Sequence, residues 1–140
     1  MNILILGSGG REHALAWAVK QNPKCDTLYA VPGNAGIAAH ATCVALNPEN
    51  SADVLSFVRE NDISFVIIGP EAPLAIGIAD DLRDAGVLTF GPSKAAARLE
   101  ASKSFTKEIC DAANAPTAAY GHFHDAESAK AYVRKQGAPI

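Results

Sequence analysis

The sequence predicts an α/β fold in which a parallel sheet is flanked by helices and is followed by the start of a second domain. Short apolar segments alternate with amphipathic ones over residues 2–90, a pattern typical of β-α units. The segment 64–68 is almost wholly apolar, as in strands that are covered on both faces. Glycine or proline follows most of the apolar segments, which gives each strand a defined end.

The strands expected in this first part are short and rich in apolar or β-branched residues. They span residues 2–6, 26–31, 42–46, 64–68 and 87–90. The first strand ends at a glycine-rich turn, and the second ends at the turn Pro32-Gly33-Asn34.

Helices are expected to connect these strands at 11–21, at 52–60 and from Pro73 to Gly86. Asn50 or Ser51 is expected to cap the second helix, because either side chain can accept a hydrogen bond from a free N–H group. Pro73 lies in the first turn of the third helix, where its missing N–H costs little.

From about residue 93 the pattern changes. The elements expected there are helices at 93–100 and 102–113, a strand near 117–123, a helix over 125–136 and the start of a strand at 138–140. A β-α-β unit that stops at its second strand leaves a sheet edge uncovered. We therefore expect an N-terminal domain over 1–100 and the incomplete beginning of another domain over 101–140.

Composition and charge exclude several classes of function. The chain has 140 residues, 49% hydrophobic and 19% charged, which suits a soluble globular protein of one domain or slightly more. A formal charge of -3 without a basic stripe gives no reason to expect nucleic acid as a partner. No apolar run approaches the roughly 18 residues of a membrane helix, and no signal peptide precedes the first strand, so no membrane contact is expected.

Cysteine and histidine usage adds two expectations. The three cysteines, Cys25, Cys43 and Cys110, lack metal-site spacing, which indicates reduced thiols and a cytoplasmic protein. The four histidines also lack such spacing, so no metal site is expected within the chain.

The segment Gly7–His13 is the most informative feature of the chain. It follows an apolar strand and opens a helix, so that free N–H groups and the positive end of the helix dipole suit an anionic ligand. The dinucleotide fingerprint is not met, because Glu12 occupies the position of its third glycine and the second strand has no carboxylate at its tip. The turn is therefore expected in a Rossmann-like half that binds another kind of ligand.

Residues of this turn are the first candidates for ligand contact. Gly9 and Gly10 can bring backbone N–H groups close to a ligand oxygen, unless the turn serves packing alone. Arg11 is a cation near a helix N-terminus, which is unfavourable, and the sequence shows no structural contact that would offset this cost. This favours a role in binding a carboxylate or phosphate. Glu12 suits the dipole by itself, and His13 is expected to have a structural role.

Two further candidates follow other strands. Glu71 comes just after Gly69-Pro70, where a carboxylate can accept two hydroxyl hydrogen bonds and hold a ribose diol. The alternative for Glu71 is a plain carboxylate at a helix start. Asn34 lies at the same edge of the predicted sheet, either as a ligand contact or as a residue in a left-handed turn.

Five motifs, in this order and spacing, resemble one family, the phosphoribosylamine–glycine ligases (glycinamide ribonucleotide synthetases) of the ATP-grasp superfamily. They are Gly7-Ser8-Gly9-Gly10-Arg11-Glu12-His13-Ala14, Pro32-Gly33-Asn34, Gly69-Pro70-Glu71-Ala72-Pro73-Leu74, Phe90-Gly91-Pro92 and Ser102-Lys103-Ser104-Phe105-Thr106-Lys107. The resemblance covers essentially the whole chain and concerns the N-terminal third of the family.

The resemblance implies a pre-ATP-grasp domain that helps hold a sugar phosphate, followed by the start of an ATP-grasp domain. It implies a ligase of de novo purine biosynthesis that joins glycine to 5-phosphoribosylamine with ATP and Mg²⁺ (Mn²⁺ being an alternative). The products would be glycinamide ribonucleotide, ADP and phosphate. The implied partners are these small molecules, and the full-length form is expected to be a monomer.

Individual residues receive roles from this resemblance. Glu71 would hold the ribose, and Lys103 would reach the phosphates of ATP. With the candidates from the turns, the expected substrate-binding set is Gly9, Gly10, Arg11, Asn34 and Glu71. Lys107 is interpreted as part of a solvated basic face, and Ser102 as a helix cap.

The sequence departs from the family in one respect. It stops before the family's ATP lid, adenine-binding strand and magnesium carboxylates, so the catalytic residues are expected beyond Ile140 and the isolated chain is expected to be inactive. The alternative hypothesis is a non-catalytic module that binds a sugar phosphate or a nucleotide.

Overall fold

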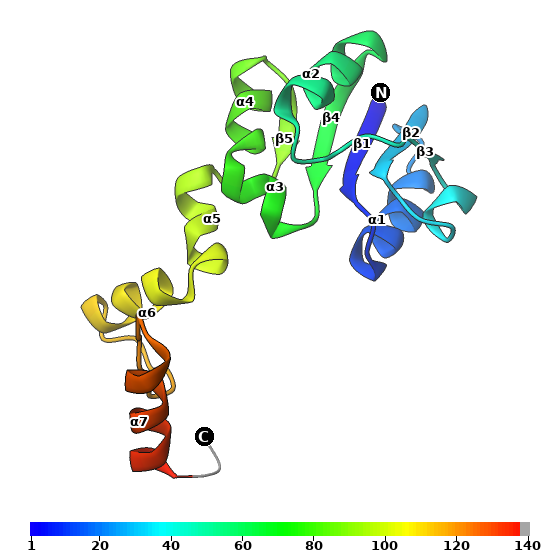
Figure 1. Ribbon diagram of the computed structural model, residues 1–140. Coiled ribbons are helices and arrows are strands. Elements are labelled where there is room, and N and C mark those ends of the chain that lie inside the picture. The colour runs from blue at the N-terminus through cyan, green and yellow to red at the C-terminus, as the bar shows by residue number, and fades with distance from the viewer. Residues whose placement is uncertain (138–140) are drawn as a thin grey trace. The chain divides into compact units, whose positions relative to one another are not determined.

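The computed structural model describes residues 1–137, and its first part contains a five-stranded sheet in the order β3-β2-β1-β4-β5 (Figure 1). The strands are β1 (Asn2–Gly7), β2 (Thr27–Pro32), β3 (Thr42–Cys43), β4 (Ile63–Ile68) and β5 (Leu88–Phe90). Every strand pairing is parallel. The predicted α/β fold is therefore confirmed, although β3 is shorter than the strand expected over 42–46.

Helices cover both faces of this sheet (Figure 1). They are α1 (Gly10–Lys20), the short 3-10 helix η1 (Ile37–Ala39), α2 (Ser51–Glu60), α3 (Glu71–Ile76), α4 (Ile78–Asp84) and α5 (Lys94–Ala101). Successive side chains of a strand point to opposite faces. Leu4 and Leu6 of β1 accordingly pack with apolar side chains of α2, α3, α4 and α5, whereas Ile3 and Ile5 pack with those of α1 and η1.

Local sequence explains where two of the helices begin and end. The Asn50 side chain accepts a hydrogen bond from Asp53 N at 3.3 Å, so Asn50 is the cap of α2. The helix expected from Pro73 to Gly86 begins earlier, at Glu71, and is broken at Gly77. Gly77 has a φ of 106°, a left-handed conformation that a residue without a Cβ adopts readily.

The chain divides into two compact units, Met1–Ala101 and Ser102–Ile140. The second unit contains the helices α6 (Lys103–Ala112) and α7 (Ala126–Gln136). The Ser102 side chain caps α6 as predicted, because its Oγ accepts a hydrogen bond from Phe105 N at 3.3 Å.

One predicted element of the second unit is absent. Residues 117–123 form no strand, because the described part of this unit contains no second strand with which they could exchange hydrogen bonds. The strand start expected at 138–140 lies outside the described residues. Over residues 1–137, no helix combines the length and the apolar content that crossing a bilayer requires.

The sheet places the ends of three strands side by side. Because β1 lies between β2 and β4 and all three are parallel, their carboxyl ends meet at one edge. Two backbone hydrogen bonds continue the ladder past the strands, from Gly33 N to Gly7 O at 3.2 Å and from Gly69 N to Leu6 O at 3.0 Å. The loops that follow β1, β2 and β4 therefore start next to one another.

Candidate functional site

The candidate site lies where these three loops meet, at the carboxyl edge of the sheet. The glycine turn after β1 opens α1 at Gly10, and the loop after β4 opens α3 at Glu71. The loop after β2 is tied to the glycine turn by Asn34, whose Nδ2 donates to Ser8 O at 2.7 Å. This arrangement is typical of ligand sites in open α/β sheets.

The centre of the site is the carboxylate of Glu12. Glu12 is 3% exposed, and it is the one buried charged residue in the part of the chain that the structure describes. Its Oε2 accepts a hydrogen bond from Gly9 N at 2.6 Å, and its Oε1 accepts one from Arg11 Nε at 2.9 Å. The expectation that Glu12 merely suits the helix dipole is therefore too limited, because its charge is satisfied by two specific donors.

Three glycines make room for this carboxylate. A Cβ at Gly9 would lie 2.8 Å from Glu12 Oε2, a Cβ at Gly7 would lie 2.6 Å from Glu12 Cγ, and a Cβ at Gly69 would overlap Oε1. Gly7 and Gly9 come from the turn after β1, whereas Gly69 follows β4. The glycines of two loops thus serve the close approach of one buried side chain.

The two glycines proposed for ligand contact differ in what they still offer. Both are exposed, but the Gly9 amide already donates to Glu12. Gly10 is the first residue of α1, and its N–H has no hydrogen-bond acceptor among residues 1–137. Gly10 therefore carries the free N–H at the positive end of this helix.

The structure shows a stabilising contact for Arg11 that the sequence did not reveal. Its Nε donates to Glu12, and this ion pair offsets the unfavourable position of a cation near a helix N-terminus. The pKa of Arg11 is raised above its ordinary value, chiefly by the hydrogen bond to Glu12, with smaller contributions from the charges of Glu12, Glu100 and Glu71. Its side chain is 59% exposed, and its two terminal nitrogens have no hydrogen-bond acceptor among the described residues.

Glu71 is exposed at the carboxyl edge of the sheet. It is the first residue of α3, after Pro70. Within residues 1–137 its carboxylate has no hydrogen-bond donor and no ion-pair partner. Because its charge contributes to the raised pKa of Arg11, Glu71 and Arg11 belong to the same electrostatic neighbourhood.

Asn34 uses both ends of its side-chain amide. Besides the bond of Nδ2 to Ser8, its Oδ1 accepts a hydrogen bond from Ile37 N at 2.8 Å, which begins η1. The left-handed turn considered for Asn34 is wrong, because it is the preceding Gly33 that has a positive φ, of 73°. Asn34 fixes the loop after β2 against the glycine turn.

A hollow of about 420 Å³ lies beside the N-terminal half of α1 and is lined by Gly10, His13, Ala14 and Trp17. Of the predicted substrate-binding residues, only Gly10 lines it. His13 stacks on His40, with ring centroids 5.6 Å apart, and lies against Gly36. These contacts support the structural role expected for His13.

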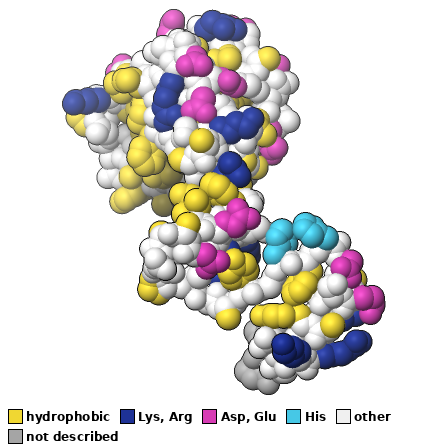
Figure 2. Space-filling view, turned by 90° about the vertical axis from the view of Figure 1, so that its left-hand side faces the viewer, with side chains coloured by type: hydrophobic (Ala, Val, Ile, Leu, Met, Phe, Trp, Pro, Cys, Tyr) yellow, Lys and Arg dark blue, Asp and Glu magenta, His cyan; other side chains and the backbone are white. Residues whose placement is uncertain are grey.

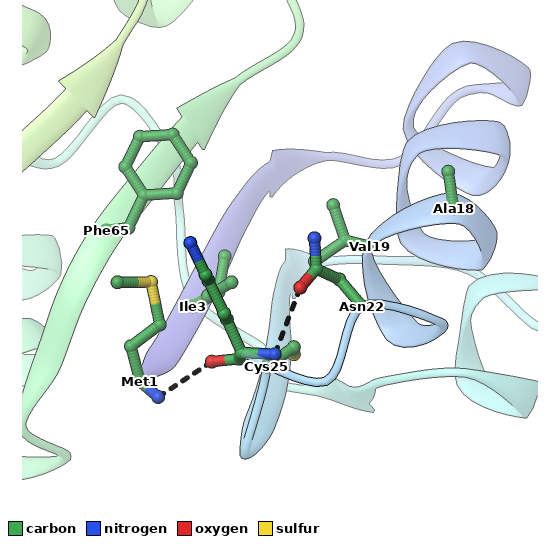
Figure 3. Close-up of a pocket in the computed structure, with 8 residues that line it drawn as sticks. Met1, Ile3, Ala18, Val19, Asn22, Cys25 and Phe65 are labelled. Carbon is green, nitrogen blue, oxygen red and sulfur yellow. Dashed lines mark hydrogen bonds between the residues drawn. The ribbon is translucent and has the colours of Figure 1, made fainter.

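Another hollow, of about 320 Å³, is lined mainly by apolar side chains that include Met1, Ile3, Val19 and Phe65 (Figure 3). Its border is held by Met1 N, which donates to Lys24 O at 2.8 Å. Met1 and Ile3 are at the amino end of β1, so this hollow lies at the edge opposite to the candidate site.

The second unit carries Lys103. It is the first residue of α6, is exposed, and lines a hollow of about 220 Å³ together with Lys107, Tyr120 and His122. Lys107 is not a solvated base: it is half-buried, and its Nζ donates to Thr117 Oγ1 at 2.6 Å and to Ala118 O at 2.8 Å. The interpretation of Lys107 as part of a solvated basic face is wrong, because its ammonium donates to two acceptors in the segment that follows α6.

The surface shows neither a large patch of one charge on the face drawn in Figure 2 nor a cluster of metal ligands among residues 1–137. On the face shown in Figure 2, basic and acidic side chains are interspersed over the first unit. Over residues 1–137, no group of three or more His, Cys, Asp or Glu side chains could hold a metal ion. The magnesium carboxylates that the resemblance implies are expected beyond Ile140, so the described residues do not test them.

Comparison with known proteins gives a family match and close relatives. Residues 1–100 match the protein family described as phosphoribosylglycinamide synthetase, N domain. Over the full chain, the sequence is 62% identical to phosphoribosylamine–glycine ligase from Agrobacterium fabrum and 59% identical to that from Mesorhizobium japonicum. Each match covers 100% of this chain and 33% of the relative, so the chain spans about a third of the length of these curated relatives.

Comparison with solved structures gives the same family and fold. Phosphoribosylamine–glycine ligase from Thermotoga maritima superposes with a TM-score of 0.69 at 27% identity, over 96% of this chain and 30% of that chain. N5-carboxyaminoimidazole ribonucleotide synthetase from Thermus thermophilus gives a TM-score of 0.66 at 19% identity, over 98% of this chain and 37% of that chain. At the lower identity, the likeness concerns the fold alone.

Proposed function

Because this chain belongs to the phosphoribosylglycinamide synthetase N-domain family, we propose that it is the sugar-phosphate-binding part of a phosphoribosylamine–glycine ligase. The proposed reaction joins glycine to 5-phosphoribosylamine in the cytoplasm at the expense of ATP, giving glycinamide ribonucleotide, ADP and phosphate for purine synthesis. The chain is about a third as long as its relatives, so this activity is proposed for the whole enzyme, which we take to be a monomer. The proposed contribution of the chain is binding.

The observation that carries this proposal is the unpartnered carboxylate of Glu71 beside the glycine turn. A carboxylate that no described residue engages can accept hydrogen bonds from two neighbouring hydroxyls, as a ribose ring presents them. The free N–H of Gly10 and the terminal nitrogens of Arg11 supply donors for the phosphate at the N-terminus of α1. In this arrangement Asn34 keeps the neighbouring loop in place.

In the proposed mechanism this edge of the sheet supplies positioning. ATP activates the glycine carboxylate, and the amine nitrogen of the ribosylamine then replaces phosphate, so the amine must be held close to the activated carbon. Holding a reactant in a near-attack geometry converts a bimolecular step into an effectively unimolecular one. Glu71, Gly10 and Arg11 would hold the sugar phosphate, and we assign no proton transfer to them.

For the second unit we propose the beginning of the ATP-grasp domain, from about residue 101. Lys103, exposed at the start of α6, is proposed to reach the ATP phosphates. Lys107 is less suited to that task, because its ammonium already donates to Thr117 and Ala118.

The test is a titration of this chain with ribose 5-phosphate and with ATP, followed by backbone amide NMR. We expect ribose 5-phosphate to shift the amides of Gly10 and Glu71, and the Glu71→Ala variant to lose this response. Glu60→Ala is the matched control, because Glu60 is an exposed carboxylate at the end of α2 that precedes β4. An unchanged response in Glu71→Ala, or tight binding of ATP by this chain, would contradict the assignment.

A further inference from the structure

We propose that Glu12 is a positioning residue, which fixes the guanidinium of Arg11 for binding of the sugar phosphate. The inference rests on the proposed function, because it concerns the same site. It deepens that function by giving the binding edge a buried side chain that meets no ligand itself.

The contacts of the Glu12 carboxylate fix it in one position. It is buried at 3% exposure, and its two oxygens have different partners, Gly9 N on Oε2 and Arg11 Nε on Oε1. It also lies against Gly7 and Gly69, at which a Cβ would collide with it. A charged group that is buried, paired and closely packed has little freedom to move.

This position determines which edge of Arg11 is free. The Nε–H is used by Glu12, so the plane of the guanidinium is set by a bond to a fixed oxygen. The two terminal nitrogens, which bind phosphate or carboxylate in a bidentate manner, have no acceptor among the described residues. An exposed arginine without such a bond would be free to adopt many rotamers.

The same carboxylate connects the binding loops. Glu12 and Gly9 belong to the β1–α1 connection, whereas Gly69 directly precedes Pro70 and Glu71. Through its contact with Gly69, Glu12 holds the start of α1 at a constant distance from the loop that carries the proposed ribose ligand. Arg11 and Glu71 are thereby presented together.

A double-mutant cycle on this chain tests the inference, with the affinity for ribose 5-phosphate as the measured quantity. The variants are Glu12→Gln, Arg11→Ala and the double variant. A glutamine keeps the volume and an acceptor for Gly9, but its NH₂ group would face the Arg11 donor. We expect each single variant to weaken binding about tenfold, as for a lost bond to a charged group, and the double variant to be no weaker than either.

The control is Asp53→Asn. Asp53 is the third residue of α2, as Glu12 is the third residue of α1, but it is exposed. It therefore reproduces the change of charge at a helix N-terminus without touching the site, and its binding is expected to equal that of the unmodified chain. Additive losses in the cycle, or wild-type affinity in Glu12→Gln, would overturn the positioning role and leave the proposed function intact.

A second measurement needs no variant and so does not depend on how Glu12→Gln folds. In the unmodified chain, the Arg11 Nε–H proton is expected to be shifted and protected from solvent exchange relative to that of Arg59, an exposed arginine of α2. Exchange as fast as that of Arg59 would overturn the inference. Absence of any ribose 5-phosphate binding by the unmodified chain would instead overturn the proposed function, and the inference with it.

Discussion

Gly69 approaches Glu12 so closely that a Cβ at residue 69 would overlap Oε1 of the Glu12 carboxylate. The first residue directly follows β4 and the second lies in the first turn of α1, so the contact joins a loop and a helix that are distant in sequence. It explains why a buried carboxylate can lie at the crowded edge of a parallel sheet.

Gly69→Ala is expected to lower the free energy of unfolding by about 1–3 kcal/mol, as overpacking of a close contact does. Urea denaturation monitored by circular dichroism measures the effect. Gly10→Ala is the control, because a Cβ there meets nothing within 4 Å and alanine favours the helix. Equal stability of the two variants would show that the carboxylate moves aside without cost.

Asn34→Ala is expected to free the loop after β2, because both hydrogen bonds of the side chain are lost. The loss of stability should be about 1–2 kcal/mol, and hydrogen exchange of Ile37 N–H should accelerate. Asn34→Asp keeps the acceptor for Ile37 N but has no donor for Ser8 O, so it should preserve protection of Ile37 alone. Slow exchange of Ile37 N–H in Asn34→Ala would show that the loop after β2 keeps its conformation without the Asn34 hydrogen bonds.

Lys107→Met is expected to loosen the second unit, because the apolar stem remains while the donor to Thr117 and Ala118 disappears. Amide protection in α6 should fall and the resonance of Thr117 should shift. Lys103→Met is the matched control from the first turn of the same helix, and it should leave both unchanged, since Lys103 is exposed. If Lys103→Met lowered the protection of α6 and Lys107→Met did not, the structural role would belong to Lys103 and the prediction would be wrong.

The stability of the first turn of α7 is expected to fall at acid pH. Asp125 accepts hydrogen bonds from the backbone and the side chain of Ser128, which lower its pKa below the ordinary value of 3.8. Its stabilisation is therefore present above the unfolded-state pKa and is lost as the pH falls through the lower folded-state pKa. NMR titration of the Asp125 carboxyl group, with helix shifts of α7, measures this.

Asp125→Asn is the control for that titration, since asparagine also caps helices but does not ionise. In this variant the amide shift of Ser128, which the residue at position 125 caps, should respond much less to pH below roughly 4. A folded-state pKa of Asp125 at or above the ordinary value would contradict the role of the Ser128 bonds.

Sequence reasoning located the candidate site better than it described it. Gly10, Arg11 and Glu71 were proposed as site residues because each closely follows a predicted strand and lies at the start of a helix, a signal that is local. Glu12 was undervalued, although one sign was present: a carboxylate stands where the dinucleotide fingerprint has a close-packed glycine. Its burial depends on Gly69, and nothing in the local pattern relates these two positions.

The sequence alone determined the order of strands and helices over residues 1–100, the cap Ser102 and the family, because these features reside in short windows and in motif spacing. For the cap of α2 it left Asn50 and Ser51 as alternatives, of which the structure shows Asn50. Only the tertiary structure decided that the helix after Pro70 breaks at Gly77, that 117–123 form no strand and that Lys107 is engaged. The physical reason is that the break depends on the backbone conformation of Gly77, whereas the absent strand and the engagement of Lys107 depend on which other segments are close enough to pair with them. The order β2-β1-β4 in space is what brings Gly69 against Glu12.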